Sequence, residues 1–185
     1  FINKGNGDFT KSNTYTGFNY PYSIRSADLN NDGFIDLSVP QNDSSYVILL
    51  INDSTGNFVH DTLRVDTYGN DSQQLTDFNN DRYTDIAQQS NYAVTIYQNL
   101  QKNRFNDTAQ IALAQDPSSL ITGDINADGY QDLVVPYSDT SASLDLLINN
   151  QDATYTQDAV TGFKGNFLDI ASMDMDSDGD QDFAL

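Results

Sequence analysis

Short apolar runs recur along the chain and are separated by turns rich in Asp, Asn and Gly. The run 46–51 is apolar without alternation, which is typical of a strand covered on both faces. One repeat predicts four strands: A over 23–27, B over 36–39, C over 46–51, and D from 58 to about 65. Every one of the 27 acidic residues is Asp, a poor helix former. The pattern therefore predicts an all-β fold.

A nine-residue motif occurs four times, starting at Asp28, Asp77, Asp124 and Asp174, with oxygen-bearing side chains at positions 1, 3, 5 and 9. Position 6 is Gly in three copies, which allows the backbone to turn through φ > 0. A hard cation such as Ca²⁺ takes 6–8 oxygen ligands, and a coiled loop supplies them from alternate residues and one backbone carbonyl. We therefore predict up to four calcium sites, one in each motif.

The predicted ligands include the residue at position 7, which would contribute its backbone carbonyl. They are Asp28, Asn30, Asp32, Phe34 and Asp36; Asp77, Asn79, Asp81, Tyr83 and Asp85; Asp124, Asn126, Asp128, Tyr130 and Asp132; and Asp174, Asp176, Asp178, Asp180 and Asp182.

The motif is not an EF-hand, which needs a bidentate Glu at position 12 and a flanking helix on each side. Position 12 is Val39, Gln88, Val135 or Leu185, and the residues after the first and third motifs are apolar and β-branched, as in strands. The glycine-rich nonapeptide of calcium-binding β-helices is also absent.

The motifs belong to a longer repeat, because their starts at 28, 77, 124 and 174 give periods of 49, 47 and 50 residues. A second marker runs in phase with them, an Asn followed six positions later by an aromatic residue: Asn3, Asn52, Asn99 and Asn149. Each of these Asn residues lies 25 residues before the next motif, whereas the connection between strands B and C varies in length. A period of about 49 residues made of strands and turns is typical of a β-propeller blade.

The pattern Asp-x-Asn-x-Asp-Gly-x-x-Asp-Leu-x-Val, followed by Leu-Leu-Ile-Asn-x-x-x-Gly-x-Phe, resembles the FG-GAP/VCBS repeat family over essentially all 185 residues. These repeats form the calcium-binding blades of integrin α-subunit-like propellers and of many secreted bacterial proteins. The resemblance implies blades of four antiparallel strands with a calcium loop between strands A and B. Arg82 departs from the pattern, because it stands at position 6 of the second motif, where the other motifs have Gly. A non-glycine residue in the left-handed region costs about 1–2 kcal/mol. We predict that the second site is the weakest and the fourth the tightest.

The repeat divides the chain into one propeller segment, with part of a blade at 1–27, blades at 28–76, 77–123 and 124–173, and the start of another at 174–185. Either these residues are a segment of a longer propeller, or the two ends close a four-bladed ring. The composite blade would lack about ten residues equivalent to 40–49, which favours the segment.

The formal net charge of −19 follows largely from the motifs, and four bound Ca²⁺ would bring it to −11. Eight scattered Lys and Arg form no basic patch, so we expect no nucleic-acid partner. Extracellular calcium modules bind at roughly 10⁻⁴–10⁻³ M, which favours an extracellular or cell-surface location. No apolar run reaches membrane-spanning length, so we expect no membrane insertion in this segment.

Beyond the motifs, the connections between strands B and C are candidate binding loops, because they lie opposite the motifs on a rigid scaffold. Tyr46, Tyr92 and Tyr137 lie in or beside them and suit either contacts with sugars or proteins, or simple coverage of the sheet ends. His60, the only histidine, is expected to be an ordinary strand residue, with no Cys or second His to form a catalytic constellation.

The leading functional prediction is a non-catalytic extracellular module that binds a protein or glycan ligand in adhesion. One alternative is a self-associating structural subunit of a surface layer or filament. Another is the propeller of a secreted carbohydrate-active enzyme, which loss of activity on mutating Asp66 or Asp139 would support.

Overall fold

The structure is a computed structural model, and it describes residues 1–42, 45–65, 72–102, 104–137, 143–162, 170–176 and 181–184. All secondary structure in these residues is β, as the sequence predicts, and none of it is helical. Accordingly, within the described residues there is no helix long and apolar enough to cross a membrane.

Three four-stranded antiparallel sheets form the body of the molecule, and in each the strands pair in chain order. Sheet 1 contains β3 (Arg25–Ala27), β4 (Asp36–Pro40), β5 (Tyr46–Asn52) and β6 (Phe58–Arg64). Sheet 2 contains β7 (Gln73–Thr76), β8 (Asp85–Ser90), β9 (Ala93–Asn99) and β10 (Phe105–Ala112). Sheet 3 contains β11 (Ile121–Gly123), β12 (Asp132–Pro136), β13 (Leu144–Asn149) and β14 (Tyr155–Val160). The four strands predicted for one repeat are thus confirmed in sheet 1 to within two residues at each end.

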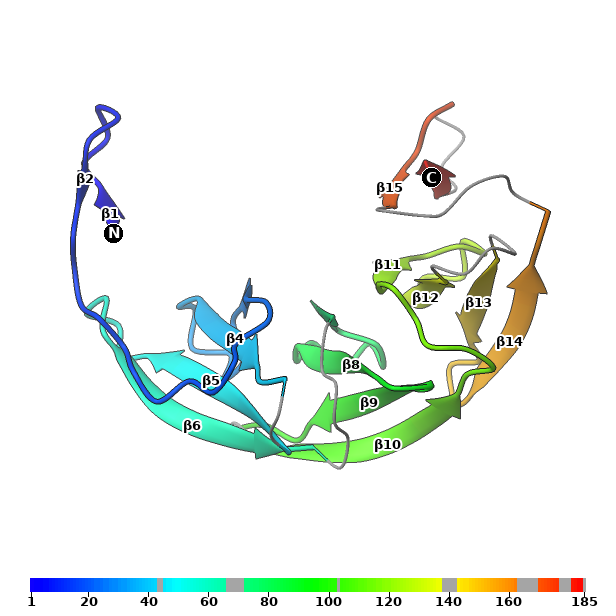
Figure 1. Cartoon of the computed structure of the whole chain (residues 1–185), viewed down its shortest axis with the longest axis horizontal. Coiled ribbons are helices and arrows are strands. Elements are labelled where there is room, and N and C mark those ends of the chain that lie inside the picture. The colour runs from blue at the N-terminus through cyan, green and yellow to red at the C-terminus, as the bar shows by residue number, and fades with distance from the viewer. Residues whose placement is uncertain are drawn as a thin grey trace.

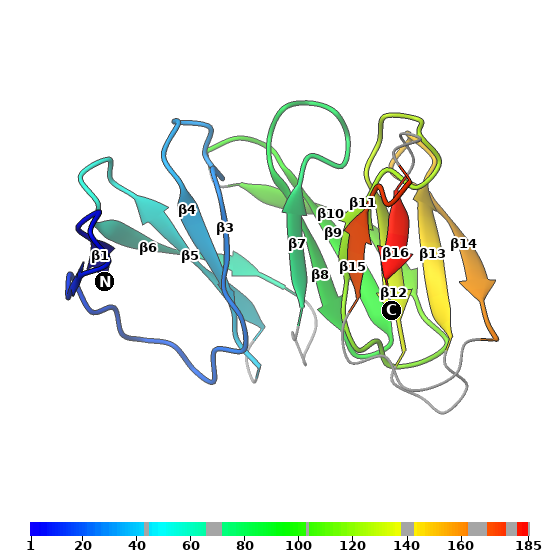
Figure 2. The same cartoon turned by 90° about the horizontal axis from the view of Figure 1, so that it is seen from above.

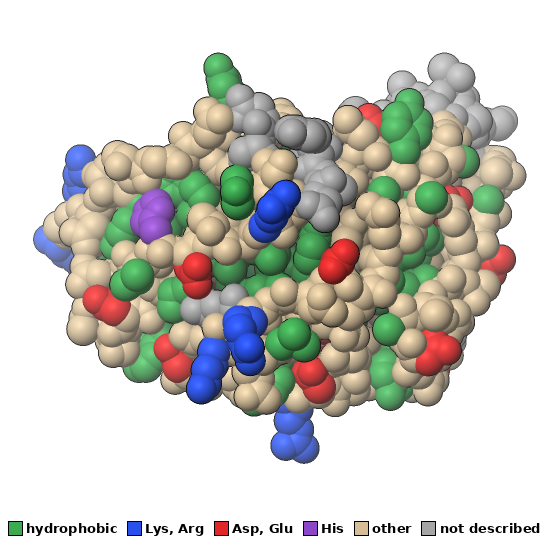
Figure 3. Space-filling model, turned by 90° about the horizontal axis from the view of Figure 1, so that it is seen from below, with side chains coloured by type: hydrophobic (Ala, Val, Ile, Leu, Met, Phe, Trp, Pro, Cys, Tyr) green, Lys and Arg blue, Asp and Glu red, His purple; other side chains and the backbone are tan. Residues whose placement is uncertain are grey.

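Two smaller sheets complete the described fold: β1 (Ile2–Asn3) with β2 (Phe9–Thr10), and β15 (Ala171–Met173) with β16 (Asp182–Ala184). The five sheets follow one another along an open arc, and the two small sheets lie at its opposite tips (Figure 1). In the residues described, the sheets therefore do not close into a ring. The outer strands β6, β10 and β14 form the convex side, where basic side chains are interspersed with Asp and apolar residues (Figure 3).

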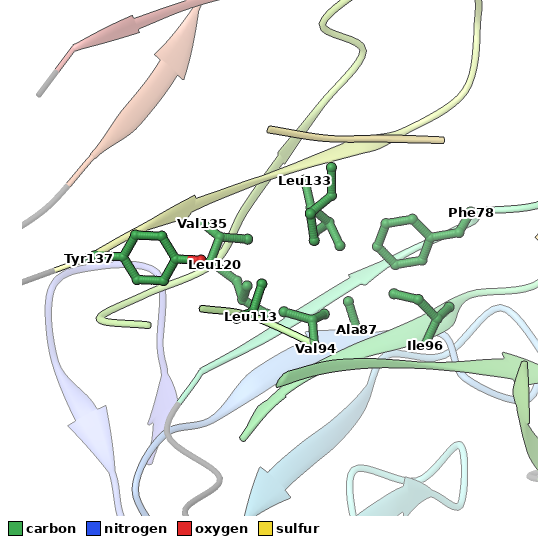
Figure 4. Close-up of a cluster of buried hydrophobic side chains, with 10 residues drawn as sticks. Phe78, Ala87, Val94, Ile96, Leu113, Leu120, Leu133, Val135 and Tyr137 are labelled. Carbon is green, nitrogen blue, oxygen red and sulfur yellow. The ribbon is translucent and has the colours of Figure 1, made fainter. Parts of the chain in front are cut away.

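Neighbouring sheets pack face to face, which explains why the third strand of each repeat is apolar without alternation. In β5, the four residues from Val47 to Leu50 are all buried, as expected for a strand covered on both faces. Between sheets 2 and 3, Val94 and Ile96 of β9 pack against Leu133 and Val135 of β12 (Figure 4). Since fully burying one such side chain contributes about 1.5–3 kcal/mol, these inter-sheet cores hold the arc together.

The interface between sheets 1 and 2 also contains a buried polar chain. The hydroxyl of Ser38 donates to Gln73 Oε1 at 2.7 Å, and Gln73 Nε2 donates in turn to Gln88 Oε1. Gln73 and Gln88 are fully buried, so each needs such partners to offset the loss of hydration. Apolar residues occupy the equivalent positions of sheet 3, Leu120 and Val135.

Candidate metal loops at one edge of the sheets

The first motif is a compact loop between β3 and β4, held by its own carboxylates. Asp28 accepts hydrogen bonds from the backbone N–H groups of Asp32 (3.1 Å) and Gly33 (2.8 Å) through its two oxygens. Asp32 Oδ1 accepts from Phe34 N at 2.8 Å, and Asn30 Oδ1 accepts from Asp32 N at 3.0 Å. The side chains at positions 1, 3 and 5 are thereby gathered on the inside of one turn. Asp32 is exposed at the edge of the sheet, and Asp28 and Asn30 are half-buried there.

The second and third motifs repeat this geometry between β7 and β8 and between β11 and β12. Asp77 accepts from Asp81 N at 3.1 Å and from Arg82 N at 2.6 Å. In the third motif, Asp124 accepts from the N–H groups of the residues at positions 5 and 6 at 3.0 and 2.9 Å. Arg82 therefore keeps the hydrogen bond that Gly makes elsewhere. All three loops lie at the same edge of their sheets, together with the turns between the third and fourth strands (Figure 2).

Two positions in each loop adopt left-handed backbone conformations. Position 6 has φ values of 87°, 74° and 88° at Gly33, Arg82 and Gly129, as the glycine pattern predicts. Position 4 also has positive φ, 60° and 59° at Asn31 and Asn80 and 55° in the third loop, which the sequence analysis did not anticipate. Asn tolerates this region better than most residues, which would have been the available signal.

The last Asp of the first three motifs has a different environment, because Asp36, Asp85 and Asp132 are fully buried. In the second loop, Asp85 Oδ2 accepts from Phe78 N at 3.0 Å and Oδ1 accepts from Asn99 N at 2.8 Å. The first and third loops make the same pair of bonds at 2.7–2.9 Å. Each last Asp therefore joins the start of its loop to the end of the third strand.

Burial disfavours the ionised form of these carboxylates, because it removes them from water. Burial first, with the nearby carboxylates of Asp81 and Asp77 adding to it, raises the pKa of Asp85 to about 6, although two backbone N–H bonds oppose the rise. Burial likewise raises the pKa of Asp36 and that of Asp132. An array of carboxylates of which one is desolvated is chemically suited to a hard cation, which would neutralise it. The oxygens at positions 1, 3, 5 and 9 and the carbonyl at position 7 could supply the ligands.

The fourth motif is described only in part. The carboxylate oxygens of Asp174, Asp176 and Asp182 lie within 4.8 Å of one another, which is close enough to share an ion. Asp182 Oδ2 accepts from Met175 N at 2.9 Å, as the last Asp does in the other loops. The predicted ligands Asp178 and Asp180 lie outside the described residues.

The candidate residues outside the motifs lie in different environments. Tyr46 and Tyr92 are 47 % and 58 % exposed at the edge opposite the loops, as a contact surface requires. Tyr137 is only 2 % exposed and its hydroxyl donates to Asp145, so of its two expected roles the structure favours coverage of the sheet end over contact with a ligand. His60 lies in β6 and packs at 5.8 Å between ring centroids against Phe18, as expected of an ordinary strand residue. Asp66 and Asp139 lie outside the described residues.

The Asn that recurs 25 residues before each motif has a role that the sequence alone does not reveal. In the structure, Asn99 Nδ2 donates both to Thr84 O of its own loop (3.0 Å) and to Leu29 O of the preceding loop (2.6 Å). The constant spacing of this Asn was the available signal, but contacts between residues 70 positions apart do not follow from spacing alone.

Comparison with known proteins agrees with this description. A family model described as an FG-GAP-like repeat matches residues 77–135, which run from the second loop into β12. A solved structure of the Photorhabdus luminescens Tc holotoxin pore is similar to 85 % of this chain, with a TM-score of 0.52 and 18 % sequence identity. The match covers 8 % of that protein's chain, and at this identity it supports the fold alone. No curated protein matches the sequence. The resemblance to FG-GAP-like repeats is thus confirmed over residues 77–135.

Proposed function

From the FG-GAP-like repeat sequence that this chain carries, we propose that it is a calcium-stabilised segment of a β-propeller that binds a protein or glycan outside the cell. The observation that supports calcium is the repeated pairing of exposed or half-buried oxygens at positions 1, 3 and 5 with one buried carboxylate, Asp36, Asp85 or Asp132. A divalent cation would offset the cost of keeping that carboxylate charged. The four loops would then hold Ca²⁺ through the ligands named above, and the ion would stiffen the turn between the first two strands.

The extracellular part of the proposal follows from affinity. Calcium loops of extracellular modules bind at roughly 10⁻⁴–10⁻³ M, a concentration of free Ca²⁺ that is sustained outside cells. The binding part is supported by Tyr46 and Tyr92, which are exposed at the edge opposite the loops. A rigid scaffold with aromatic side chains on its loop edge suits recognition of a sugar or protein surface. We propose no catalytic role.

Thermal unfolding of the chain in about 1 mM Ca²⁺ and in chelator tests the calcium proposal. We expect a higher melting temperature in calcium, rising further with concentration, since a ligand that binds only the folded state stabilises it by mass action. Magnesium at the same concentration is the control for ionic strength. Equal melting temperatures in all three buffers would exclude a stabilising calcium site.

Binding to a glycan and matrix-protein array in calcium tests the recognition proposal. We expect Tyr46→Ala and Tyr92→Ala to weaken binding, whereas Phe9→Ala is a matched control, because Phe9 is 63 % exposed but lies at one tip of the arc. Equal loss of binding in all three variants would point to a non-specific apolar contact.

A second candidate, a self-associating structural subunit, is favoured by one apolar cavity of about 360 Å³ on sheet 1. It is lined in part by Tyr22 and Ile24, which are 61 % and 56 % exposed. Leu120, at the position equivalent to Ile24, is 1 % exposed and belongs to the core between sheets 2 and 3. Light scattering of the wild type and of Ile24→Asp distinguishes the two candidates, because only a self-associating subunit becomes monomeric on this change.

A further inference from the structure

The side chain of Asn99 joins two successive loops. Its Nδ2 donates to Thr84 O at 3.0 Å in the second loop and to Leu29 O at 2.6 Å in the first. Its backbone N–H donates to Asp85 Oδ1 at 2.8 Å, and its Oδ1 accepts from Gln101 N at 2.9 Å. Asn99 is 2 % exposed, so its bonds to Leu29 O and Asp85 are buried, and those to Thr84 O and Gln101 N are partly buried.

The same arrangement joins the second loop to the third. Asn149, 3 % exposed, donates through Nδ2 to Gln131 O at 3.3 Å and to Phe78 O at 2.8 Å. Its backbone N–H donates to Asp132 Oδ1 at 2.7 Å. Because the same bonds occur at two separate junctions, the contact is a regular feature of the repeat.

Asn52, the equivalent residue of the first repeat, makes the bonds within its own repeat. Its Nδ2 donates to Ile35 O at 3.1 Å in its own loop, and its backbone N–H donates to Asp36 Oδ1 at 2.8 Å. Among the described residues, it makes no bond to another repeat's loop. Within the part of the chain that the structure describes, replacing Asn52 would therefore remove a bond inside one loop and none between the loops of two repeats, which makes it a matched control.

The residue at position 2 of each loop completes the connection. Leu29 donates its N–H to Asp36 Oδ2 at 2.9 Å within its own loop, while its carbonyl accepts from Asn99 of the next repeat. Leu29 is fully buried, so without Asn99 its carbonyl would lose this hydrogen bond with no ready access to water as a replacement. The position of the first loop's last carboxylate is therefore linked through Leu29 and Asn99 to Asp85 in the second loop.

We propose that Asn99 and Asn149 are positioning residues that couple neighbouring cation loops, so that ordering of one loop by its ion raises the affinity of the next. This inference rests on the proposed calcium function. An ion fixes the carboxylates of the first loop, which fixes Leu29 and then Asn99. Asn99 holds both Thr84 O, one residue from the second loop's last ligand, and Asp85 Oδ1 itself. By linkage the coupling is reciprocal, so the second loop supports the first to the same extent.

The first junction is the cleaner one to test. The second and third loops are also joined by Asn80 Nδ2, which donates to Gly129 O at 3.1 Å, so two contacts act together there. The first two loops, in contrast, can be separated spectroscopically. Position 7 is Tyr83 in the second loop and Tyr130 in the third, but Phe34 in the first. Terbium, a luminescent substitute for calcium that Tyr excites, therefore reports on the second and third loops, and Tyr130→Phe reduces the third loop's signal.

The experiment is a double-mutant cycle in the Tyr130→Phe background, with terbium affinity at the second loop as the readout. Asp32→Ala disables the first loop. Asn99→Asp keeps the acceptor for Gln101 N but removes the two donated hydrogen bonds. We expect Asp32→Ala to weaken terbium binding at the second loop by about fivefold or more when Asn99 is present, and to have no effect after Asn99→Asp. With the control Asn52→Asp, the effect of Asp32→Ala should persist.

The outcomes separate the inference from the function on which it rests. If no variant binds terbium or calcium while circular dichroism shows it folded, the proposed function fails. If the wild type binds but Asp32→Ala acts equally with and without Asn99, or does not act at all, the coupling is overturned and the calcium sites stand. If Asn99→Asp does not fold in calcium, the equivalent cycle at the junction of the second and third loops decides. It combines Asn149→Asp with Asp81→Ala, and terbium binding at the third loop is read through Tyr130. The background is Asn80→Ala, which removes the second contact, with Tyr83→Phe, which reduces the second loop's signal. There too, equal effects of Asp81→Ala with and without Asn149 overturn the proposal.

Discussion

Replacing Arg82 by Gly is expected to stabilise the protein, because the second loop holds a bulky residue where its neighbours have Gly. Arg82 has φ of 74°, close to the 87° of Gly33 and the 88° of Gly129. A non-glycine residue in this region costs about 1–2 kcal/mol. Glycine also gains conformational entropy in the unfolded state, which offsets about 0.5–1 kcal/mol of that relief. The net expectation is a gain of about 0.5–1 kcal/mol in the free energy of unfolding.

The same change should affect calcium affinity much less than stability. Arg82 N donates to Asp77 within the loop itself, so we expect the same backbone strain with and without an ion, and strain common to both states does not oppose binding. What remains is the repulsion between the Arg82 guanidinium and the ion. For a divalent ion at a separation of about 9 Å in water, this repulsion is about 0.9 kcal/mol. Arg82 is exposed, and physiological salt screens this to about a third. We therefore expect the second site to be the weakest by less than about twofold on this account.

Thermal unfolding in chelator and calcium titration by calorimetry measure the two effects separately. A gain of about 0.5–1 kcal/mol corresponds to a rise in melting temperature of about 1–4 °C for a chain of this size. Arg82→Asn, which tolerates the left-handed region, should gain stability as well, whereas Arg82→Lys keeps both strain and charge and should change neither quantity. If Arg82→Gly is no more stable than Arg82→Lys in chelator, the strain argument is wrong.

Three further predictions concern the third repeat. Ala127→Asn should stabilise by up to about 1 kcal/mol in chemical denaturation, because Ala127 has φ of 55° and Asn tolerates that region; an unchanged midpoint would show no strain there. Leu147→Ala should destabilise by about 2–5 kcal/mol, since Leu147 is fully buried between sheets 2 and 3, and a loss below 1 kcal/mol would contradict that packing. Burial, followed by the hydrogen bond to Asp145, raises the pKa of Tyr137 far above its usual value. The stabilisation from this raised pKa is therefore complete below about pH 10 and is lost progressively as the pH rises above it. In a titration followed by absorbance at 295 nm, Tyr137→Phe should remove one tyrosine that ionises only when the protein unfolds at alkaline pH.

The strands and the loop geometry could be predicted from the sequence because both are local. Turn chemistry and apolar runs determine where each strand begins and ends, and the oxygen pattern of a nine-residue motif determines how it coils. Within the described residues, the first three loops have the expected conformation at positions 1, 5 and 6, including at Arg82. Local sequence could also predict that β5 is covered on both faces.

What could not be predicted depends on contacts between distant residues. From the sequence, Tyr137 could either contact a ligand or cover the end of the sheet. Asp145 of the adjacent strand accepts its hydroxyl and allows it to be buried, which the sequence does not reveal. Gln73 and Gln88 are polar residues at core positions, which only partners such as Ser38 of the neighbouring sheet make tolerable. Sequence periodicity identifies which residues recur, but not which residue of another repeat they meet.

The variation in repeat length has a physical explanation in this arrangement. The connection between the second and third strands joins neighbours within one sheet, and in sheet 2 it is the two-residue turn between β8 and β9. It lies at the edge opposite the Asp loops, so a change in its length disturbs none of the bonds made by Asn99 or Asp85 (Figure 2). In contrast, the 25 residues from each Asn to the next motif must lead from the convex side of one sheet to the inner edge of the next (Figure 1). Hydrogen bonds of the loops fix the chain at both ends of that path, so the length of this 25-residue stretch is constrained. The connection between the second and third strands has no such constraint and can vary in length.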